Sequence, residues 1–184
     1  MADIIRQFLK SDNFWISLSR DVLFAVVAVS AVALVLYTYA GVWPPLVSVD
    51  GTSMYPHMQD GDLILIQGID KSKITTYEAG KESGYSTFEN YGDVIVYRPF
   101  GRTDMTPVIH RAMYKVNASD PMWEGSIPAP DNGIITQGDN NFLYDQCSGI
   151  CANTPVKDEW ILGVAKHRIP LLGHVRGLLG AIGI

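Results

Sequence analysis

A run without charged residues, from Val22 to Trp43, constrains this chain more than any other feature. As an α-helix the run would extend roughly 33 Å, enough to cross the hydrocarbon core of a bilayer. Aromatic residues stand at both ends, where amphipathic rings favour the membrane interfaces, and Pro44 and Pro45 then end the helix. We therefore expect a transmembrane anchor over residues 22–43. The alternative is a cleaved signal peptide, but the run exceeds the usual apolar core of about 7 to 15 residues.

Basic residues flank only one side of this run. Arg6, Lys10 and Arg20 precede it, whereas the next basic residue after it is Lys71. By the positive-inside rule, residues 1–21 are expected in the cytosol and the rest of the chain outside it. The compartment would be the exterior of a cell membrane or, alternatively, the lumen of the endoplasmic reticulum.

Residues 44–168 are expected to form one mainly β domain. A chain of 184 residues with 47% apolar residues can bury one sizeable core. Its formal charge of −5 and the lack of a basic cluster argue against a nucleic-acid partner. Short, β-branched apolar runs bounded by Gly, Asp or Pro indicate strands. They cover residues 46–49, 63–67, 94–97, 108–116, 133–137 and 160–167.

Three further segments are expected to lie outside the sheet. Residues 70–91 and 117–132 are polar and rich in turn-forming residues, without a sustained period, and are interpreted as surface insertions. The apolar tail, 169–184, is too short to span a bilayer, so we expect it to pack on the domain or lie at the membrane surface.

Cys147 and Cys151 are the only cysteines of the chain. An extracytoplasmic location permits disulfides, and two thiols alone make a poor zinc site. A local disulfide is the favoured interpretation, with two unrelated thiols as the alternative. No metal or other cofactor is indicated.

Four polar residues could carry chemistry. Ser53 lies in a Gly-rich turn, His110 falls within a predicted strand, and Asp139 and Asp145 follow another strand. A serine becomes a nucleophile when a neighbouring base takes its proton and a third group orients that base. Taken singly, each residue also fits a turn or a sheet surface, so no single residue identifies a catalytic site.

Taken together, these segments resemble type I signal peptidases of the archaeal and endoplasmic-reticulum branch. The resemblance covers nearly the whole chain, and the matching motifs stand in the family's order behind a membrane anchor. They are G-T-S-M-Y-P at 51–56, G-D-V-I-V-Y at 92–97, V-I-H-R at 108–111, G-D-N-N at 138–141 with Asp145 after it, and I-L-G-V and I-P-L-L-G within 161–173. Bacterial members carry a lysine where this chain has His110.

The resemblance implies a signal-peptidase β fold on one N-terminal transmembrane helix and a role for each polar residue. Ser53 would be the nucleophile, His110 the general base and Asp145 the carboxylate that orients His110. Asp139 would support the site structurally or electrostatically. The backbone N–H of Ser53 would be one oxyanion donor. Many relatives have a second donor, a serine, where this chain has Gly51, so Thr52 or a backbone N–H would have to replace it.

The resemblance also implies the substrate and the partners. Secreted and membrane preproteins would be cut after small residues, with contacts from the serine turn at Gly51, Thr52, Met54 and Pro56. Ser53 lies within roughly 35 Å of the end of the anchor even if the link is fully extended, so the site works close to the lipid bilayer. Other membrane subunits are a further class of partner that the sequence leaves open.

Two alternatives belong to other classes. A Ser/Lys protease of the self-cleaving repressor class would need a lysine as its base. A non-enzymatic, membrane-anchored β domain would leave the serine, the histidine and the carboxylates as a coincidence. Reactivity of Ser53 toward an acylating probe separates this second alternative from an enzyme.

Overall fold

The computed structural model describes residues 13–170 and divides the chain into two compact units, one up to Tyr39 and one from Ala40 onward. Nearly all of the expected apolar tail and most of the cytosolic segment therefore lie outside the described residues. The first unit is the helix α2, Phe14–Ala40. It begins earlier and ends earlier than the charge-free run, because helical geometry tolerates the polar residues before Val22, and Gly41 then adopts a positive φ of 71°.

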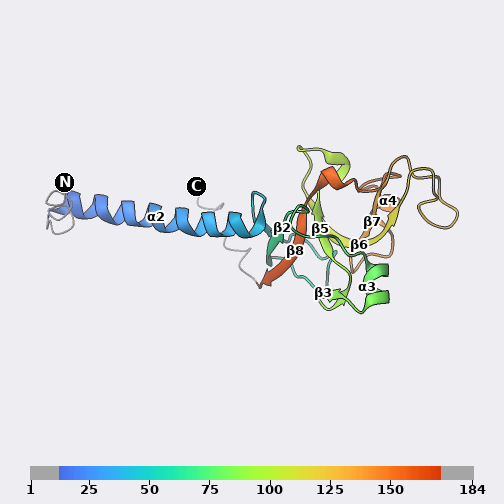
Figure 1. Ribbon diagram of the computed structural model, residues 1–184, viewed down its shortest axis with the longest axis horizontal. Helices are drawn as coiled ribbons and strands as arrows, with labels where there is room; N and C mark the ends of the chain where they lie inside the picture. Colours follow the sequence, from blue (N-terminus) through green and yellow to red (C-terminus); the bar gives the residue numbers. More distant parts are fainter. Residues whose placement is uncertain (1–12, 171–184) are drawn as a thin grey trace. The chain divides into compact units, whose positions relative to one another are not determined.

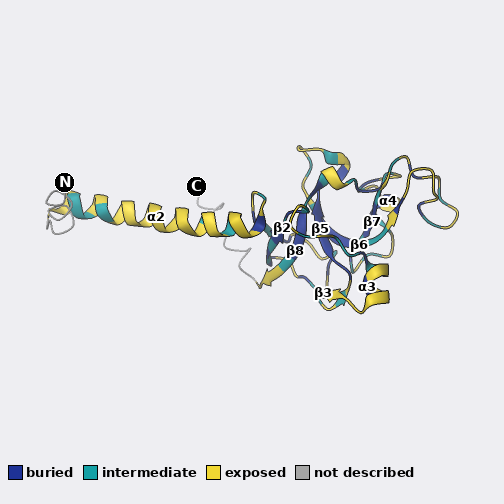
Figure 2. Cartoon of the chain, viewed as in Figure 1, coloured by how far each residue is buried: buried dark blue, intermediate teal, exposed yellow. Residues whose placement is uncertain are grey.

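Helix α2 exposes apolar side chains along its length (Figure 2). It is long and apolar enough to cross a membrane. A helix also satisfies its own backbone hydrogen bonds, which a hydrocarbon environment requires.

The second unit is built on one antiparallel sheet in the order β1-β2-β8-β5-β6-β7 (Figure 1). Its strands are β1 Leu46–Ser48, β2 Leu63–Gln67, β5 Val94–Tyr97, β6 Val108–Val116, β7 Gly133–Gln137 and β8 Ile161–Ile169. Each strand expected from the sequence is present, with ends that agree within two residues. The expected mainly β domain is therefore confirmed at this level.

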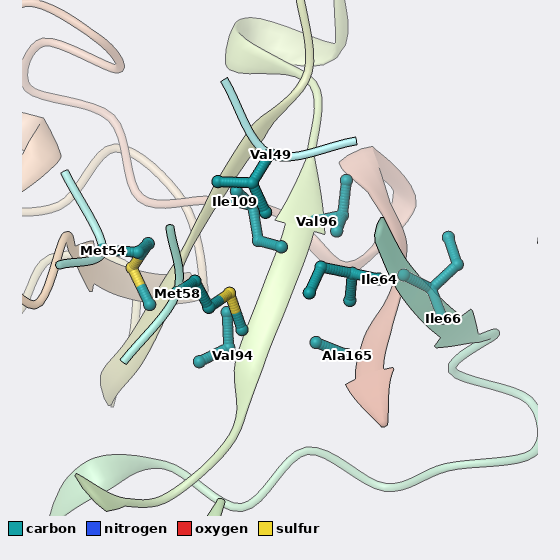
Figure 3. Packing of buried hydrophobic residues seen from close by; sticks show 9 residues of the cluster. All are labelled: Val49, Met54, Met58, Ile64, Ile66, Val94, Val96, Ile109 and Ala165. Atoms are coloured by element: carbon teal, nitrogen blue, oxygen red, sulfur yellow. The ribbon is translucent and has the colours of Figure 1, made fainter. Parts of the chain in front are cut away.

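The central strand β5 is buried on both faces. Val94 and Val96 belong to one apolar cluster, shown in Figure 3, while Ile95 and Tyr97 belong to a second. Successive side chains of a strand point to opposite faces, so a strand covered on both sides is apolar throughout. The sheet thus separates two cores, and both contribute to the candidate site.

Two strands are each preceded by a Gly-Asp pair, Gly61-Asp62 before β2 and Gly92-Asp93 before β5, and the two aspartates make similar contacts. Asp62 and Asp93 are buried, and their carboxylates accept backbone N–H groups from Gln59 and Thr75, respectively. In each case an aspartate ties the loop before a strand to the start of that strand.

The segment 70–91 contains more regular structure than the sequence suggested. It forms helix α3, Tyr77–Ser83, and the hairpin of β3, Ser86–Thr87, with β4, Asn90–Tyr91. Thr76 caps the helix at its start and Gly84 ends it in the left-handed conformation. Two turns of helix are too short to show a period, which explains why the pattern was missed.

The segment 117–132 agrees better with a surface insertion. It has one isolated bridge, Pro121 with Pro128, and otherwise turns and bends. The remaining short helices are η1 Pro99–Gly101, α4 Asp145–Ser148 and η2 Asp158–Trp160.

The expected disulfide is absent, since Cys147 and Cys151 are both free thiols. Cys147 is exposed in α4, whereas Cys151 is fully buried in the second apolar cluster. The two side chains therefore lie in different environments. Burial, with a contribution from the charge of Asp145, raises the pKa of the Cys151 thiol to about 11.

Candidate active site

Strand β6 presents two neighbouring polar residues, His110 and Arg111, to opposite faces of the sheet. His110 pairs with Ile95 of β5 and Arg111 pairs with Val94, and these partners belong to the two different apolar clusters. Both side chains are buried, at 3% and 1% exposed. Because a buried polar group requires partners, each face must supply them.

On the face of the second apolar cluster, His110 connects a serine and a carboxylate. Its Nε2 lies 2.9 Å from Ser53 Oγ, and its Nδ1 lies 2.9 and 2.8 Å from the two Asp145 oxygens. With the proton on Nδ1, that nitrogen donates to Asp145 and leaves Nε2 free to accept from the Ser53 hydroxyl. This is the arrangement in which a serine can lose its proton as it attacks.

Ser53 occupies a turn that the core holds in place. The residues Met54 and Met58 that follow it are buried in the first apolar cluster, and Met58 N–H donates to Met54 O at 2.9 Å (Figure 3). Gly51 has a φ of 93°, and its N–H donates to Asp60 Oδ1. The turn therefore fixes the serine from both sides.

Asp145 begins helix α4 and is fully buried. The hydroxyls of Tyr97 and Thr136 both donate to its Oδ2, at 2.6 and 2.7 Å. Burial alone would raise the pKa of Asp145, but the hydrogen bonds from His110, Thr136 and Tyr97 outweigh it, so that the pKa is lowered. Apart from the imidazole, the side-chain donors to this carboxylate are uncharged hydroxyls, so the cation that could balance its charge is a protonated His110.

The hydroxyl of Tyr97 remains a donor at working pH. Burial and the adjacent Asp145 charge raise the pKa of Tyr97 above its ordinary value. Asp145 therefore keeps this hydrogen bond wherever the carboxylate itself is ionised.

On the face of the first apolar cluster, Arg111 donates two hydrogen bonds to Asp139. Its Nε and Nη2 each lie 2.7 Å from a carboxylate oxygen. His57 Nδ1 lies 2.7 Å from Asp139 Oδ2. Arg111 Nη1 also donates to four carbonyls, those of Thr87, Asn90, Tyr91 and Gly92. Within residues 13–170, the Asp139 carboxylate makes its hydrogen bonds to Arg111 and His57, and none joins it to Ser53 or His110.

The loop that carries Asp139 also touches the serine turn directly. The N–H of Asn140 donates to Ser53 O at 2.8 Å, and its side-chain amide donates to Thr52 O. A Cβ at Gly138 would come within 2.6 Å of Ser53 O and 2.9 Å of His110 Nε2. Only glycine therefore fits at this position.

The four residues expected to contact substrate have different environments. Gly51, Thr52 and Pro56 are exposed around Ser53, as a binding surface requires. Met54 is only 1% exposed. Its side chain packs in the first apolar cluster and supports the turn, so it does not lie on the exposed surface around Ser53 where a substrate contact was expected.

Two backbone N–H groups beside Ser53 make no hydrogen bond within the described residues. They are the N–H of Thr52 and the N–H of Ser53. The Thr52 side chain is exposed next to them. Beside the Ser53 N–H, the Thr52 N–H and side chain are the nearby groups that could take the place of the second donor expected at Gly51.

Four residues of this site escaped the sequence analysis: His57, Tyr97, Arg111 and Thr136. Tyr97 and Arg111 stood in the motifs G-D-V-I-V-Y and V-I-H-R, and a charged residue inside a buried strand was a usable signal. No comparable signal marked Thr136, because its contact with Asp145 depends on the packing of α4 over β7.

Comparison with known proteins adds no assignment. No protein-family model matches the chain, and no curated protein matches it. Within the described residues, no cluster of histidine, cysteine and carboxylate side chains could hold a metal ion. A functional assignment therefore rests on the geometry of the site and on the motifs.

Proposed function

We propose that this protein is a membrane-bound serine endopeptidase of the signal peptidase type, which removes signal peptides from secreted and membrane preproteins. The observation that carries the proposal is the line of contacts from Ser53 Oγ through His110 to the buried Asp145. A Ser/Lys mechanism would need a lysine as base, and the lysine of the same strand, Lys115, is exposed further along β6.

The chemistry is acyl transfer through Ser53. As Ser53 Oγ attacks the scissile carbonyl, His110 Nε2 takes the hydroxyl proton, and Asp145 stabilises the imidazolium that results. The carbonyl oxygen becomes an oxyanion, for which the N–H groups of Thr52 and Ser53 are candidate donors. The same proton then passes to the leaving amine, and the acyl-enzyme forms. Water attacks that ester with His110 again acting as base, which releases the acid and restores the serine.

The anchor suggests the substrate class. A site held near the bilayer meets membrane-tethered substrates at high effective concentration. The basic flank formed by Arg6, Lys10 and Arg20 supports a cytosolic N-terminus and an extracytoplasmic β domain. A preprotein whose apolar signal lies in the membrane presents an extended segment with small side chains on that side, where Ser53 can reach it.

The test is cleavage of a membrane-inserted precursor by the purified full chain in lipid vesicles. The precursor should be cut at its signal junction, and Ser53→Ala and His110→Ala should each reduce the rate at least 10⁴-fold. Asp104→Asn, on an exposed pair with Arg102, is the matched control and should cleave normally. Full activity in Ser53→Ala would refute the proposal, and so would an intact precursor after prolonged incubation with the unaltered protein.

A further inference from the structure

The site contains a second histidine, His57, which the acyl-transfer chemistry does not use. It lies in the serine turn, and its side chain is only 18% exposed. Its Nδ1 lies 2.7 Å from Asp139 Oδ2, and the Asp139 side chain is 3% exposed. A hydrogen bond to a carboxylate that is so well shielded is stronger than one at the surface.

Asp139 joins three segments that are distant in the sequence. Its own loop follows β7, its partner Arg111 belongs to β6, and its partner His57 belongs to the serine turn. Arg111 is the chain neighbour of His110, the candidate base. The carboxylate therefore links the segment that carries the base to the segment that carries Ser53, without touching either reacting side chain.

Asp139 already has a cation as its partner. Arg111 already places two N–H groups on the Asp139 oxygens, at 2.7 Å each, so the carboxylate is neutralised. What His57 adds is a directed hydrogen bond. The backbone of the same residue is held independently, because its carbonyl accepts from Arg168 Nη1 at 2.8 Å. A change of the side chain alone therefore removes the link to Asp139 and leaves the Arg168 contact in place.

We propose that His57 is a positioning residue: its hydrogen bond to Asp139 sets the distance between Ser53 and His110. The proposal rests on the peptidase function proposed above. A displacement of the nucleophile by about 1 Å can reduce the rate about 10²-fold. Loss of the link should therefore lower kcat and leave KM nearly unchanged, since the exposed surface of the turn is not altered.

Two substitutions separate the hydrogen bond from the packing of the ring. His57→Phe keeps a ring and removes the donor, whereas His57→Asn removes the ring and keeps an amide N–H near the Nδ1 position. We expect kcat for precursor cleavage to fall roughly 10- to 100-fold in His57→Phe and to stay within about threefold of the unaltered protein in His57→Asn. Rates are normalised to the folded fraction, and His57→Leu replaces the Phe variant if the larger ring is not accommodated.

Amide hydrogen exchange gives a readout that does not depend on catalysis. The N–H of Asn140 donates to the Ser53 carbonyl, so its exchange reports whether the loop still holds the serine turn. It should exchange roughly tenfold faster in His57→Phe, and at the original rate in His57→Asn and in the surface control Asp104→Asn.

The outcomes distinguish the two proposals. Normal kcat and normal Asn140 exchange in His57→Phe would overturn the positioning role, and so would equal losses in the Phe and Asn variants. If Ser53→Ala retained full activity, the peptidase function would fail, while the exchange measurement would still decide whether His57 holds the turn.

Discussion

Strand β6 has a buried carboxylate on each face, and the two carboxylates differ in the charge of their hydrogen-bond donors. On the His110 face, Asp145 accepts from the uncharged hydroxyls of Tyr97 and Thr136 as well as from the imidazole. On the Arg111 face, the guanidinium matches the charge of Asp139. A carboxylate that keeps its charge can stabilise an imidazolium, whereas one that is already neutralised can only hold structure. The partners of each carboxylate therefore indicate its role better than its distance from the serine.

The largest expected effect is a loss of activity when the carboxylate of Asp145 is replaced. Asp145→Asn should lower kcat roughly 10⁴-fold with the fold intact, because an amide can present its NH₂ to Nδ1 and favour the wrong tautomer of His110. Far-ultraviolet circular dichroism checks the fold while precursor cleavage gives the rate. A residual rate within tenfold of the unaltered protein would mean that Asp145 does not orient the base.

The next effect is one of stability and concerns the other face. Arg111→Met leaves Asp139 buried without its cation, and breaking such a pair costs about 3–5 kcal/mol in the free energy of unfolding. Urea unfolding in detergent, followed by tryptophan fluorescence, measures this change. Arg102→Met, on an exposed pair with Asp104, is the control and should change stability little. Equal stability of the two variants would contradict the structural role of the Arg111 face.

A smaller effect depends on pH. The pKa of Asp145 is lowered in the folded state, so ionised Asp145 stabilises the fold above the ordinary carboxyl pKa of about 3.9, and this contribution disappears as the pH falls below that value. Thr136→Val removes one of the donors, so its acid unfolding should begin at higher pH. The folded fraction between about pH 2 and 6 tests this, with Asp145→Asn expected to lack this component. An unchanged acid limb in Thr136→Val would argue against the hydroxyl as a support of the charge.

The smallest effect concerns the free thiols near Asp145. Cys147 should react with a maleimide in the native protein, whereas the buried Cys151, with its raised pKa, should react only after unfolding. Mass spectrometry counts the labels. If the unfolded, unreduced protein carried no label, Cys147 and Cys151 would form a disulfide, which would contradict the structure.

The sequence predicted the positions of the strands well, but it did not predict which strands lie side by side in the sheet. Alternating and fully apolar runs gave the six strands of the sheet because burial on one or both faces leaves a direct pattern. The order β1-β2-β8-β5-β6-β7 leaves no such pattern, so the contacts of Tyr97 and Thr136 with Asp145 could not be derived. Ser53, His110 and Asp145 were identified through motifs, and the structure brings those three together.

The errors have local causes. Met54 follows the candidate nucleophile, and the sequence does not tell whether its side chain points to the surface or to the core. The spacing of Cys147 and Cys151 suits a small loop, yet Cys151 turns into the apolar cluster. His57 was not singled out, because its partner Asp139 lies far along the chain.

The carbonyls around Arg111 also bear on how the domain could be shortened by engineering. Residues 84–92 lie largely within the segment 70–91 that the sequence predicts as a surface insertion, and a designer would replace them with a tight turn. All four carbonyls that accept from Arg111 Nη1 come from residues 87–92, so the deletion would remove these acceptors from a cation that is 1% exposed. A minimal version of this domain would therefore have to retain the β3–β4 hairpin, or replace Arg111 and Asp139 together with a well-packed apolar pair.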